Sequence, residues 1–374
     1  MSKLNDLINK LCPDGVYFVK LGEVCEIKTG KGITQKDCSD AGEYPVYSGG
    51  KEPMGYYHKY NRDENTVTVS RVGAYAGYVN FVFQKFYLND KCFSVIPIQD
   101  NVNSKYLFYK LKSIEQIIIN LQSGGGVPTI NTKKVGNLEI PLPPIEVQNE
   151  IVRILDKFTQ LEAELEAELD CRKRQYEFYR DQLLSFDKIT PPERNNVVWK
   201  KLSEVCKINR GKRLVKKELM TEGKIPVYQN SLTPLGYYKE ANYPADTTFI
   251  ISAGAAGNIG FSKMDFWAAD DCICLVCDKN LNSKYLYYTM TNRQCYFLSR
   301  VRKASVPRLS RETINKFEIA IPPIEEQNRI VAILDRFESL TISLQHGLPA
   351  EIAARRQQYE YYRDKLLDFK RKTA

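Results

Sequence analysis

The feature that most constrains this chain of 374 residues is a long helical segment that occurs twice. The first copy runs from Pro143 to Phe186, and from Ile145 onward it contains neither glycine nor proline. Its two opening prolines end the preceding segment, and Glu146 and Glu150 favour the N-terminal end of a helix. The second copy runs from Pro322 to Phe369 and opens and closes with closely similar phrases. The fold therefore has to accommodate two long helices of similar sequence.

Apolar and long side chains recur along the first copy in steps of three or four residues. This spacing places them on one helical face and predicts packing against a partner helix. They are Ile151, Leu155, Phe158, Leu161, Leu165, Leu169, Arg172, Tyr176, Tyr179, Leu183 and Phe186. A helix of about 36 residues would span roughly 54 Å, which is typical of a spacer or a dimerisation element. The second copy is four residues longer and contains Gly347 and Pro349, so we expect a stutter or a kink there.

Composition limits the classes of function that are open to the chain. Hydrophobic content of 43% and charged content of 26% are ordinary for a soluble protein, and no apolar run reaches the ~20 residues of a membrane span. Residues 1–15 predict a short amphipathic helix rather than a secretory signal. Ten scattered cysteines indicate reduced thiols and a cytoplasmic location. The net charge of +9 permits a nucleic-acid partner without requiring one.

The sequence outside the two long helices also repeats. Short β-like runs follow Val19, a helix is predicted over 104–121, and a glycine loop leads to a strand before Pro143. After a polar, proline-bearing linker at 187–196, the phrases KLxEVC, GK, PVY, GYY and NSKYL return in the same order. Between these anchors the two copies differ strongly, which suggests two modules that do one job on two different targets. The predicted organisation is two globular domains, each followed by a long helix, at 1–142, 143–187, 188–321 and 322–374.

This duplicated arrangement resembles the specificity subunit of type I restriction–modification enzymes. The resemblance rests on IPLPPIEVQNEIVRILDKF and IAIPPIEEQNRIVAILDRF, on the long helix after each, and on the closing RQYEFYRDQLLSF and RQQYEYYRDKLLDF. It extends over essentially the entire chain. It implies an α+β fold in which two target-recognition domains are separated by two long antiparallel, coiled-coil-like helices with pseudo-two-fold symmetry.

The same resemblance implies the partners. Each domain would read one half of a bipartite site in the major groove of double-stranded DNA, and the helices would dock two methyltransferase subunits. Restriction subunits, which carry the motor and the nuclease, would join in the full assembly. It implies no cofactor on this chain: S-adenosylmethionine belongs to the methyltransferase partner, and ATP and Mg²⁺ belong to the motor–nuclease partner.

An antiparallel helix pair with one domain at each end shares the approximate two-fold symmetry of duplex DNA. Two half-sites lie on one face of the duplex when they are about one helical turn apart, ~34–36 Å. We therefore expect the helices to set the length of the unread gap, so that residues inserted near their middle lengthen it.

Candidate DNA-contacting residues are basic or amide side chains in predicted loops, because such groups read base edges and neutralise phosphates. In the first domain they are Lys28, Lys31, Lys51, Arg62, Arg71 and Lys133, together with Tyr47 and Tyr75. In the second they are Arg210, Lys212, Arg213, Lys216, Gln229, Asn230, Arg300, Arg302, Lys303 and Arg308. The run 299–308 is the most concentrated basic loop in the chain. The matching loop of the first domain carries glycines instead, which would let its backbone approach DNA closely.

Candidate partner-docking residues lie on the two helices and repeat in both copies. They are Gln148, Asn149, Tyr179, Arg180 and Asp181 in the first copy, and Gln327, Asn328, Tyr362, Arg363 and Asp364 in the second. The acidic residues Glu162, Glu164, Glu166 and Glu168 are typical of a solvated face that DNA phosphates would avoid.

Signals of catalysis are weak. The Gly-Lys pairs lack the upstream glycine of a phosphate loop, and only His58 and His346 are available for histidine chemistry. Cys272, Cys274 and Cys277 have a spacing that a metal site can use, but the run CICLVC is more typical of a buried strand. The chain is therefore expected to read DNA without chemistry of its own. Two alternatives stay open, a structural scaffold that brackets two protein ligands and a nuclease with an unrecognised site.

Overall fold

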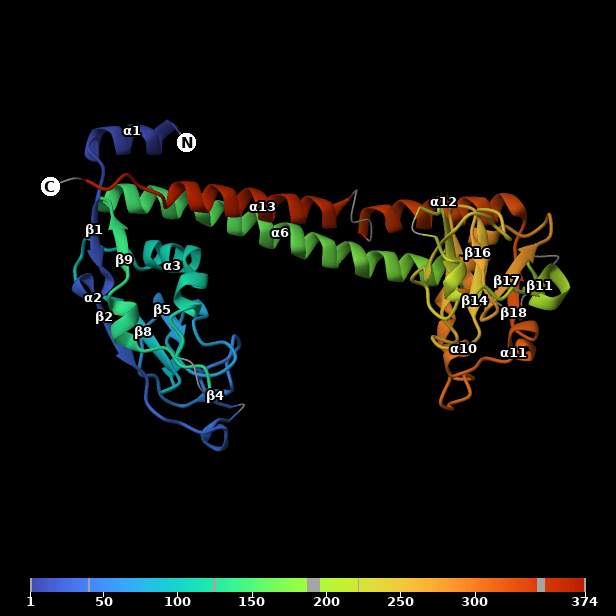
Figure 1. The fold of residues 1–374 in the computed structure, drawn as a ribbon, viewed down its shortest axis with the longest axis horizontal. Helices are drawn as coiled ribbons and strands as arrows, with labels where there is room; N and C mark the ends of the chain where they lie inside the picture. The colour runs from blue at the N-terminus through green and yellow to red at the C-terminus, as the bar shows by residue number, and fades with distance from the viewer. Residues whose placement is uncertain are drawn as a thin grey trace. The chain divides into compact units, whose positions relative to one another are not determined.

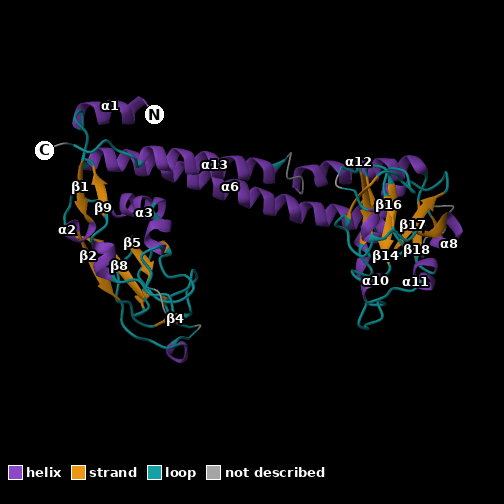
Figure 2. Cartoon of the chain, viewed as in Figure 1, coloured by secondary structure: helices purple, strands orange, loops and turns teal. Residues whose placement is uncertain are grey.

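The structure, a computed structural model, describes residues 2–39, 41–123, 126–186, 196–220, 222–341 and 347–372. The chain divides into two compact units. Unit 1 comprises Met1–Glu166 and Glu351–Ala374, and unit 2 comprises Ala167–Ala350. Each unit combines helices with small antiparallel or mixed sheets (Figures 1 and 2), which confirms the expected α+β class.

Unit 1 is built from three small sheets and short helices that cover them. Its elements are α1 (Ser2–Leu11), β1 (Tyr17–Lys20), α2 (Leu21–Val24), β2 (Cys25–Thr29), η1 (Gln35–Asp37), β3 (Tyr44–Tyr47), β4 (Tyr56–Tyr57), β5 (Thr66–Ser70), β6 (Val79–Val82), β7 (Tyr87–Leu88), β8 (Cys92–Pro97), α3 (Ser104–Ser113), α4 (Glu115–Ile119), α5 (Thr132–Gly136) and β9 (Glu139–Leu142). The main sheet has the antiparallel order β2-β8-β5-β6, a smaller one has the order β4-β3-β7, and β1 pairs with β9. Helix α3 packs on β5 and β6.

Unit 2 repeats this order element by element from β1 onward. Its elements are β10 (Val198–Lys201), α8 (Leu202–Val205), β11 (Cys206–Arg210), η2 (Lys216–Glu218), β12 (Ile225–Tyr228), β13 (Gly236–Tyr238), β14 (Thr247–Ile251), β15 (Ile259–Ser262), β16 (Trp267–Ala268), β17 (Cys272–Cys277), α9 (Ser283–Asn292), α10 (Gln294–Leu298), α11 (Arg311–Asn315) and β18 (Glu318–Ile321). The sheets have the orders β11-β17-β14-β15, β13-β12-β16 and β10-β18. The two modules therefore share one topology.

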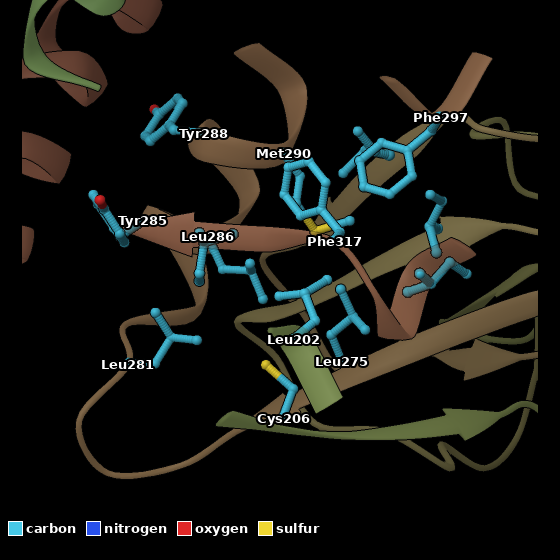
Figure 3. Packing of buried hydrophobic residues seen from close by; sticks show 14 of the residues in the cluster. Leu202, Cys206, Leu275, Leu281, Tyr285, Leu286, Tyr288, Met290, Phe297 and Phe317 are labelled. Carbon is cyan, nitrogen blue, oxygen red and sulfur yellow. The ribbon is translucent and has the colours of Figure 1, made fainter. Parts of the chain in front are cut away.

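The core of each module lies between the main sheet and its helices. The central strands β5 and β14 are buried along their whole length, because the neighbouring strands and α3 or α9 cover them. Figure 3 shows this packing in unit 2, where Leu202 of α8, Leu275 of β17 and Leu286 of α9 share one cluster with Phe297 and Phe317.

The first long helix is confirmed as α6 (Ile145–Leu183), and the division between the units falls inside it. The second is not continuous: it consists of α12 (Ile324–Thr341) and α13 (Leu348–Leu366), with 342–346 outside the described residues. Gly347 has φ +90°, and a Cβ there would lie 2.6 Å from the Ser339 carbonyl oxygen. A regular helix cannot pass through that conformation, so the four extra residues produce a break rather than a smooth stutter. The helix predicted over 104–121 is likewise interrupted, at Ile114 between α3 and α4.

Equivalent aromatic contacts join the long helices in the two units. In unit 1, Phe158 of α6 stacks on Tyr362 of α13 with ring centroids 5.7 Å apart. In unit 2, Phe337 of α12 stacks on Tyr179 of α6 at the same separation. The helical face predicted from the spacing of apolar side chains is therefore a helix–helix contact at these rings. Leu161 is 48% exposed and does not follow the pattern.

The acidic face of α6 is only partly solvated, contrary to expectation. In unit 1 the guanidinium of Arg356, on α13, forms ion pairs with Glu162 and Glu166. These pairs add a polar link beside the aromatic contact.

A second joint in each unit connects the long helix to the globular module. The side chain of Gln148 is fully buried: its Oε1 accepts a hydrogen bond from the Asn103 backbone N–H at 2.9 Å, and its Nε2 donates to the carbonyls of Asn101 and Pro143. The Asn103 side chain in turn caps α3. Gln327 makes the same three bonds around Asn282 in unit 2. The repeated phrases NSKYL and PPIExQN are therefore two halves of one joint.

Candidate nucleic-acid interface

In unit 2 the basic loop 299–308 forms a short ladder at the edge of the module. Arg302 and Arg308 are paired antiparallel: the Arg302 N–H donates to the Arg308 carbonyl at 2.8 Å, and the Arg308 N–H donates back at 3.1 Å. Both residues are exposed. Within the described part of the chain neither guanidinium has a hydrogen bond or an ion pair, and the loop itself contains no carboxylate. The ladder therefore presents two unneutralised cations.

Backbone contacts fix this ladder to the end of the main sheet. Arg308 also bridges Ala253 in the turn after β14, and the Gly254 N–H donates to Pro307. Gly254 has φ +84°, and a Cβ there would meet Asn230 at 2.8 Å, so this turn lies against the loop after β12. The structure thus brings the predicted residues Asn230, Arg302 and Arg308 to one end of the sheet.

The end of β11 and the loop after it carry three further predicted cations. The Arg210 Nε donates to the Asp270 carbonyl just before β17, and the neighbouring Ser252 N–H donates to Asp271. This places Arg210, the last residue of β11, beside the loops that surround the ladder. Lys212 and Arg213 lie on the loop that follows β11 and are exposed.

The remaining candidates of unit 2 are less closely grouped. Arg300 lies over the ring of Tyr296, with its guanidinium 3.8 Å from the centroid. Lys303 and Lys216 are exposed, and Gln229 is half-buried.

Unit 1 has the same backbone frame with different side chains. Ser123 and Thr129 stand where Arg302 and Arg308 stand, since the Ser123 N–H donates to the Thr129 carbonyl and Thr129 bridges Val72 after β5. A cavity of about 450 Å³ opens beside them. Its lining consists of Thr29, Arg71, Leu121, Ser123, Thr129, Ile130, Asn131, Thr132 and Lys134. Hydroxyl and amide groups therefore replace most of the arginines of unit 2.

Arg71 is the predicted cation that this cavity contains, and its Nη1 donates to the Asp90 carbonyl at 3.3 Å. Lys28, Lys31, Lys51 and Lys133 are exposed. Lys51 lies over the rings of Tyr75 and Tyr78, which makes Tyr75 part of a cation–aromatic group. Tyr47 is half-buried and packs edge-on against Phe86. Gly124 and Gly125 lie outside the described residues.

Arg62 has a structural role that the sequence did not indicate. Its guanidinium is buried and donates to the Ser94 hydroxyl at 2.8 Å and to the carbonyls of Asn61, Lys28 and Thr29. Burial lowers the pKa of this guanidinium below its ordinary value. Because its donors are engaged inside unit 1, Arg62 does not belong to the exposed surface.

The docking candidates on the helices fall into three groups. Gln148 and Gln327 are fully buried in the joints described above, and Asn149 and Asn328 accept a hydrogen bond from the Asn103 and Asn282 side chains. Four others are held between helical neighbours: Tyr179 and Tyr362 stack on phenylalanines, and Arg180 and Arg363 lie over Tyr176 and Tyr359. Asp181 and Asp364 are exposed and pair with the adjacent arginine. The glutamines are therefore not available as a docking surface.

The cysteine-rich run forms strand β17, in which Cys272 and Cys274 are fully buried, so the buried-strand interpretation is confirmed. Among the residues that the structure describes, no three His, Cys, Asp or Glu side chains are grouped so that they could hold a metal ion. No helix within the described ranges combines the length and apolar character needed to cross a membrane.

Sequence reasoning missed several residues of this region. Arg311 of unit 2 donates to the Ile208 carbonyl, and Thr29, Thr132 and Lys134 line the cavity of unit 1. The signal that identifies them is positional: each lies at a place in the shared frame where the two modules carry different side chains.

Comparison with known proteins gives consistent matches. The family model for the type I restriction modification DNA specificity domain matches residues 13–170 and again 195–354. The chain is 31% identical to the EcoR124I/EcoR124II specificity subunit of Escherichia coli, with 99% of this chain and 98% of the relative covered. It is 30% identical to a putative type I specificity subunit of Haemophilus influenzae, with 88% and 89% covered. A crystal structure of the type I S subunit from M. genitalium superimposes with a TM-score of 0.66 at 21% identity and covers 94% of this chain and 96% of that one.

Proposed function

Since this chain belongs to the family of type I restriction–modification specificity subunits and contains two target-recognition domains, we propose that each unit reads its half of a bipartite DNA site through the loops at the end of its main sheet. In unit 2 these loops are the Arg302–Arg308 ladder, the turn after β14 and the loops after β11 and β12. In unit 1 they are the equivalent loops around the Arg71 cavity.

One observation carries this proposal. Arg302 and Arg308 are exposed, rigidly held by backbone pairing, and without an internal anion in the described residues. Exposed guanidiniums in such a setting suit contacts with phosphates and base edges. The chemistry of methylation and cleavage then belongs to the partners. S-adenosylmethionine would bind to the methyltransferase, and ATP with Mg²⁺ to the motor–nuclease subunit. This chain would recognise the DNA and carry out no catalysis of its own. The complex would act in the cytoplasm.

The helices would set the gap and dock two methyltransferase subunits. The continuous run of α6 through both units supports the first role, because residues inserted into an unbroken helix change its length by a fixed rise of about 1.5 Å each. Exposed positions such as Asp181 and Asp364 stay candidates for the second role, whereas the buried glutamines do not.

The test is methylome sequencing of a host that expresses this chain with its cognate methyltransferase, compared with the same host without this chain. The proposal expects a new motif with two short half-sites around a fixed unread gap. A methyltransferase that binds this chain and is active, yet yields no such motif, would contradict DNA reading and favour the scaffold alternative.

Two further assays separate the alternatives. Reading of duplex DNA predicts binding by the assembled complex that weakens steeply as salt rises, because phosphate contacts release counterions. Cleavage of DNA by the purified chain with Mg²⁺ alone would instead support the nuclease alternative.

A further inference from the structure

We propose that the paired side chains of Arg302 and Arg308 recognise guanine, so that the half-site read by unit 2 contains a G·C pair on which discrimination depends. This inference rests on the proposed function and adds the chemical identity of one element of the target. The residues in question are a cross-strand pair, and three features of that pair carry the argument.

The first feature is the direction of the two side chains. Arg302 and Arg308 exchange both backbone hydrogen bonds, at 2.8 and 3.1 Å, and directly opposite residues of an antiparallel ladder project to the same face. Their Cα atoms in such a pair are about 5.5 Å apart. Both guanidiniums can therefore reach a single small target, or two adjacent ones.

The second feature is the electrostatic cost of this arrangement. Like charges directly opposite one another destabilise an antiparallel pair. No carboxylate of the loop offsets the repulsion, and no side-chain partner is found for either arginine among the described residues. An electron-rich ligand that accepts hydrogen bonds from both arginines would relieve it.

The third feature is the comparison with unit 1, where the same ladder carries Ser123 and Thr129. The fold therefore does not require arginine at either position. Phosphate contacts position a module without carrying sequence information, so two modules doing that job have no reason to differ there. Modules that read different bases are expected to share the backbone of this ladder and to differ in its side chains, as units 1 and 2 do. The bidentate contact of arginine to guanine O6 and N7 is the commonest specific pairing in the major groove.

Unit 1 also supplies the matched variant for a test. In Arg302→Ser combined with Arg308→Thr, the ladder of unit 2 carries the residues that the same ladder tolerates in unit 1, so folding and assembly should survive. The methylome of a host with this double variant and the cognate methyltransferase is compared with that of the wild type. We expect discrimination to relax about tenfold or more at a G·C pair of one half-site, while the other half-site stays unchanged.

A binding experiment with the assembled complex separates base contacts from phosphate contacts. The probe is a duplex that carries the wild-type motif, with 7-deazaguanine at the implicated position to remove the N7 acceptor. The wild-type complex should lose about tenfold in affinity for this duplex, whereas the double variant, which has already lost the contact, should bind both duplexes nearly equally.

The outcomes are distinct. An unchanged motif, relaxation only at an A·T pair, or equal weakening on all sequences with a smaller salt slope would overturn guanine recognition, and the last of these would identify a phosphate contact instead. In each of these cases the bipartite motif itself still stands, so the proposed function survives. Absence of any methylation motif with the wild-type assembly would contradict both guanine recognition and the proposed function.

Discussion

Units 1 and 2 are alike in frame and unlike in the loops at the end of the main sheet. Sheet orders, the Gln–Asn joint and the stacked aromatic contact between helices recur in both. At the ladder, by contrast, unit 1 has hydroxyl groups beside a polar cavity, and unit 2 has two arginines without an ion pair to any residue that the structure describes. The difference indicates which positions the fold needs and which it leaves free for recognition.

The comparison also separates buried polar groups from exposed ones. Arg62 of unit 1 is buried in the bridge to Phe86, whereas the residue in the equivalent bridge of unit 2, to Phe266, is Tyr243. A cation and an aromatic ring can therefore occupy the same place in the frame. Residue type alone does not distinguish a buried structural role from a binding role.

The strongest test of this comparison is Arg62→Ala. Its removal takes a donor away from the Ser94 hydroxyl and from the carbonyls of Asn61, Lys28 and Thr29, of which the Lys28 carbonyl keeps the hydrogen bond from Ser94, so we expect unit 1 to lose about 3 kcal/mol of unfolding free energy. Hydrogen exchange resolved by unit would measure this. Lys31→Ala, at an exposed loop position, is the control and should change the unfolding free energy by less than about 0.5 kcal/mol. Loss of DNA affinity with unit 1 fully stable would show that Arg62 contacts DNA after all.

The second-largest loss of stability is expected for Gln148→Ala and Gln327→Ala, which alter the joints between the long helices and the globular modules. Each removes three buried hydrogen bonds, so each should destabilise its own unit by about 2 to 3 kcal/mol. Denaturant unfolding with unit-resolved hydrogen exchange gives both values. A difference of more than ~1 kcal/mol between the two would break the equivalence of the frames, and reduced methyltransferase binding at unchanged stability would restore the docking interpretation.

Acid should affect the units differently. Glu150 is 4% exposed and is held by Arg153 and Lys3, whose hydrogen bonds lower the pKa of its carboxyl to about 2. A carboxyl with a depressed pKa stabilises the folded state at pH values above its ordinary pKa of ~4.3. This stabilisation is lost as the pH falls from there towards 2. We expect unit 1 to lose about 1 to 2 kcal/mol over that window, because the exposed partners are screened.

The variant Glu150→Gln should remove this pH dependence from unit 1. Unit 2 has Arg329 at the same place in its helix, and the hydrogen bonds from Arg329 lower the pKa of the Glu326 carboxyl below its ordinary value. Because Glu326 is 37% exposed and Glu150 only 4%, unit 2 should respond less over the same window. Unfolding curves recorded between pH 5 and pH 2 would show the difference, and an identical acid response of wild type and variant would argue against the contribution of Glu150.

The smallest effect is expected at the helix surface. Arg356→Ala removes two ion pairs between exposed groups and should cost unit 1 about 0.5 kcal/mol, less at high salt. The equivalent residue of α6 in unit 2 is Lys173, for which Lys173→Ala should be neutral. Thermal unfolding at low and high salt would measure both, and a loss above ~1.5 kcal/mol would show that the acidic face is more than a surface feature.

The repeat made the architecture predictable, because periodic spacing and recurring phrases can be found in the sequence without knowing which residues are in contact. The long helix α6 was visible in this way, whereas the four extra residues near Gly347 predicted a stutter or a kink and the structure has a break. The burial of Arg62 and of the two glutamines was not visible, because it depends on partners from other elements: Asn103 and Gln148, for example, are 45 residues apart. The Arg302–Arg308 loop was identified by its charge, but the pairing that aligns the two arginines required the structure.

The discontinuous make-up of unit 1 has a consequence for biosynthesis. Unit 2 is one uninterrupted stretch, Ala167–Ala350, whereas unit 1 needs Glu351–Ala374 to complete its helix contacts. A ribosome therefore releases every residue of unit 2 before it releases the last segment of unit 1. The module that is encoded second is the first that can finish folding, and in the nascent first module Phe158 of α6 has to wait for its stacking partner Tyr362.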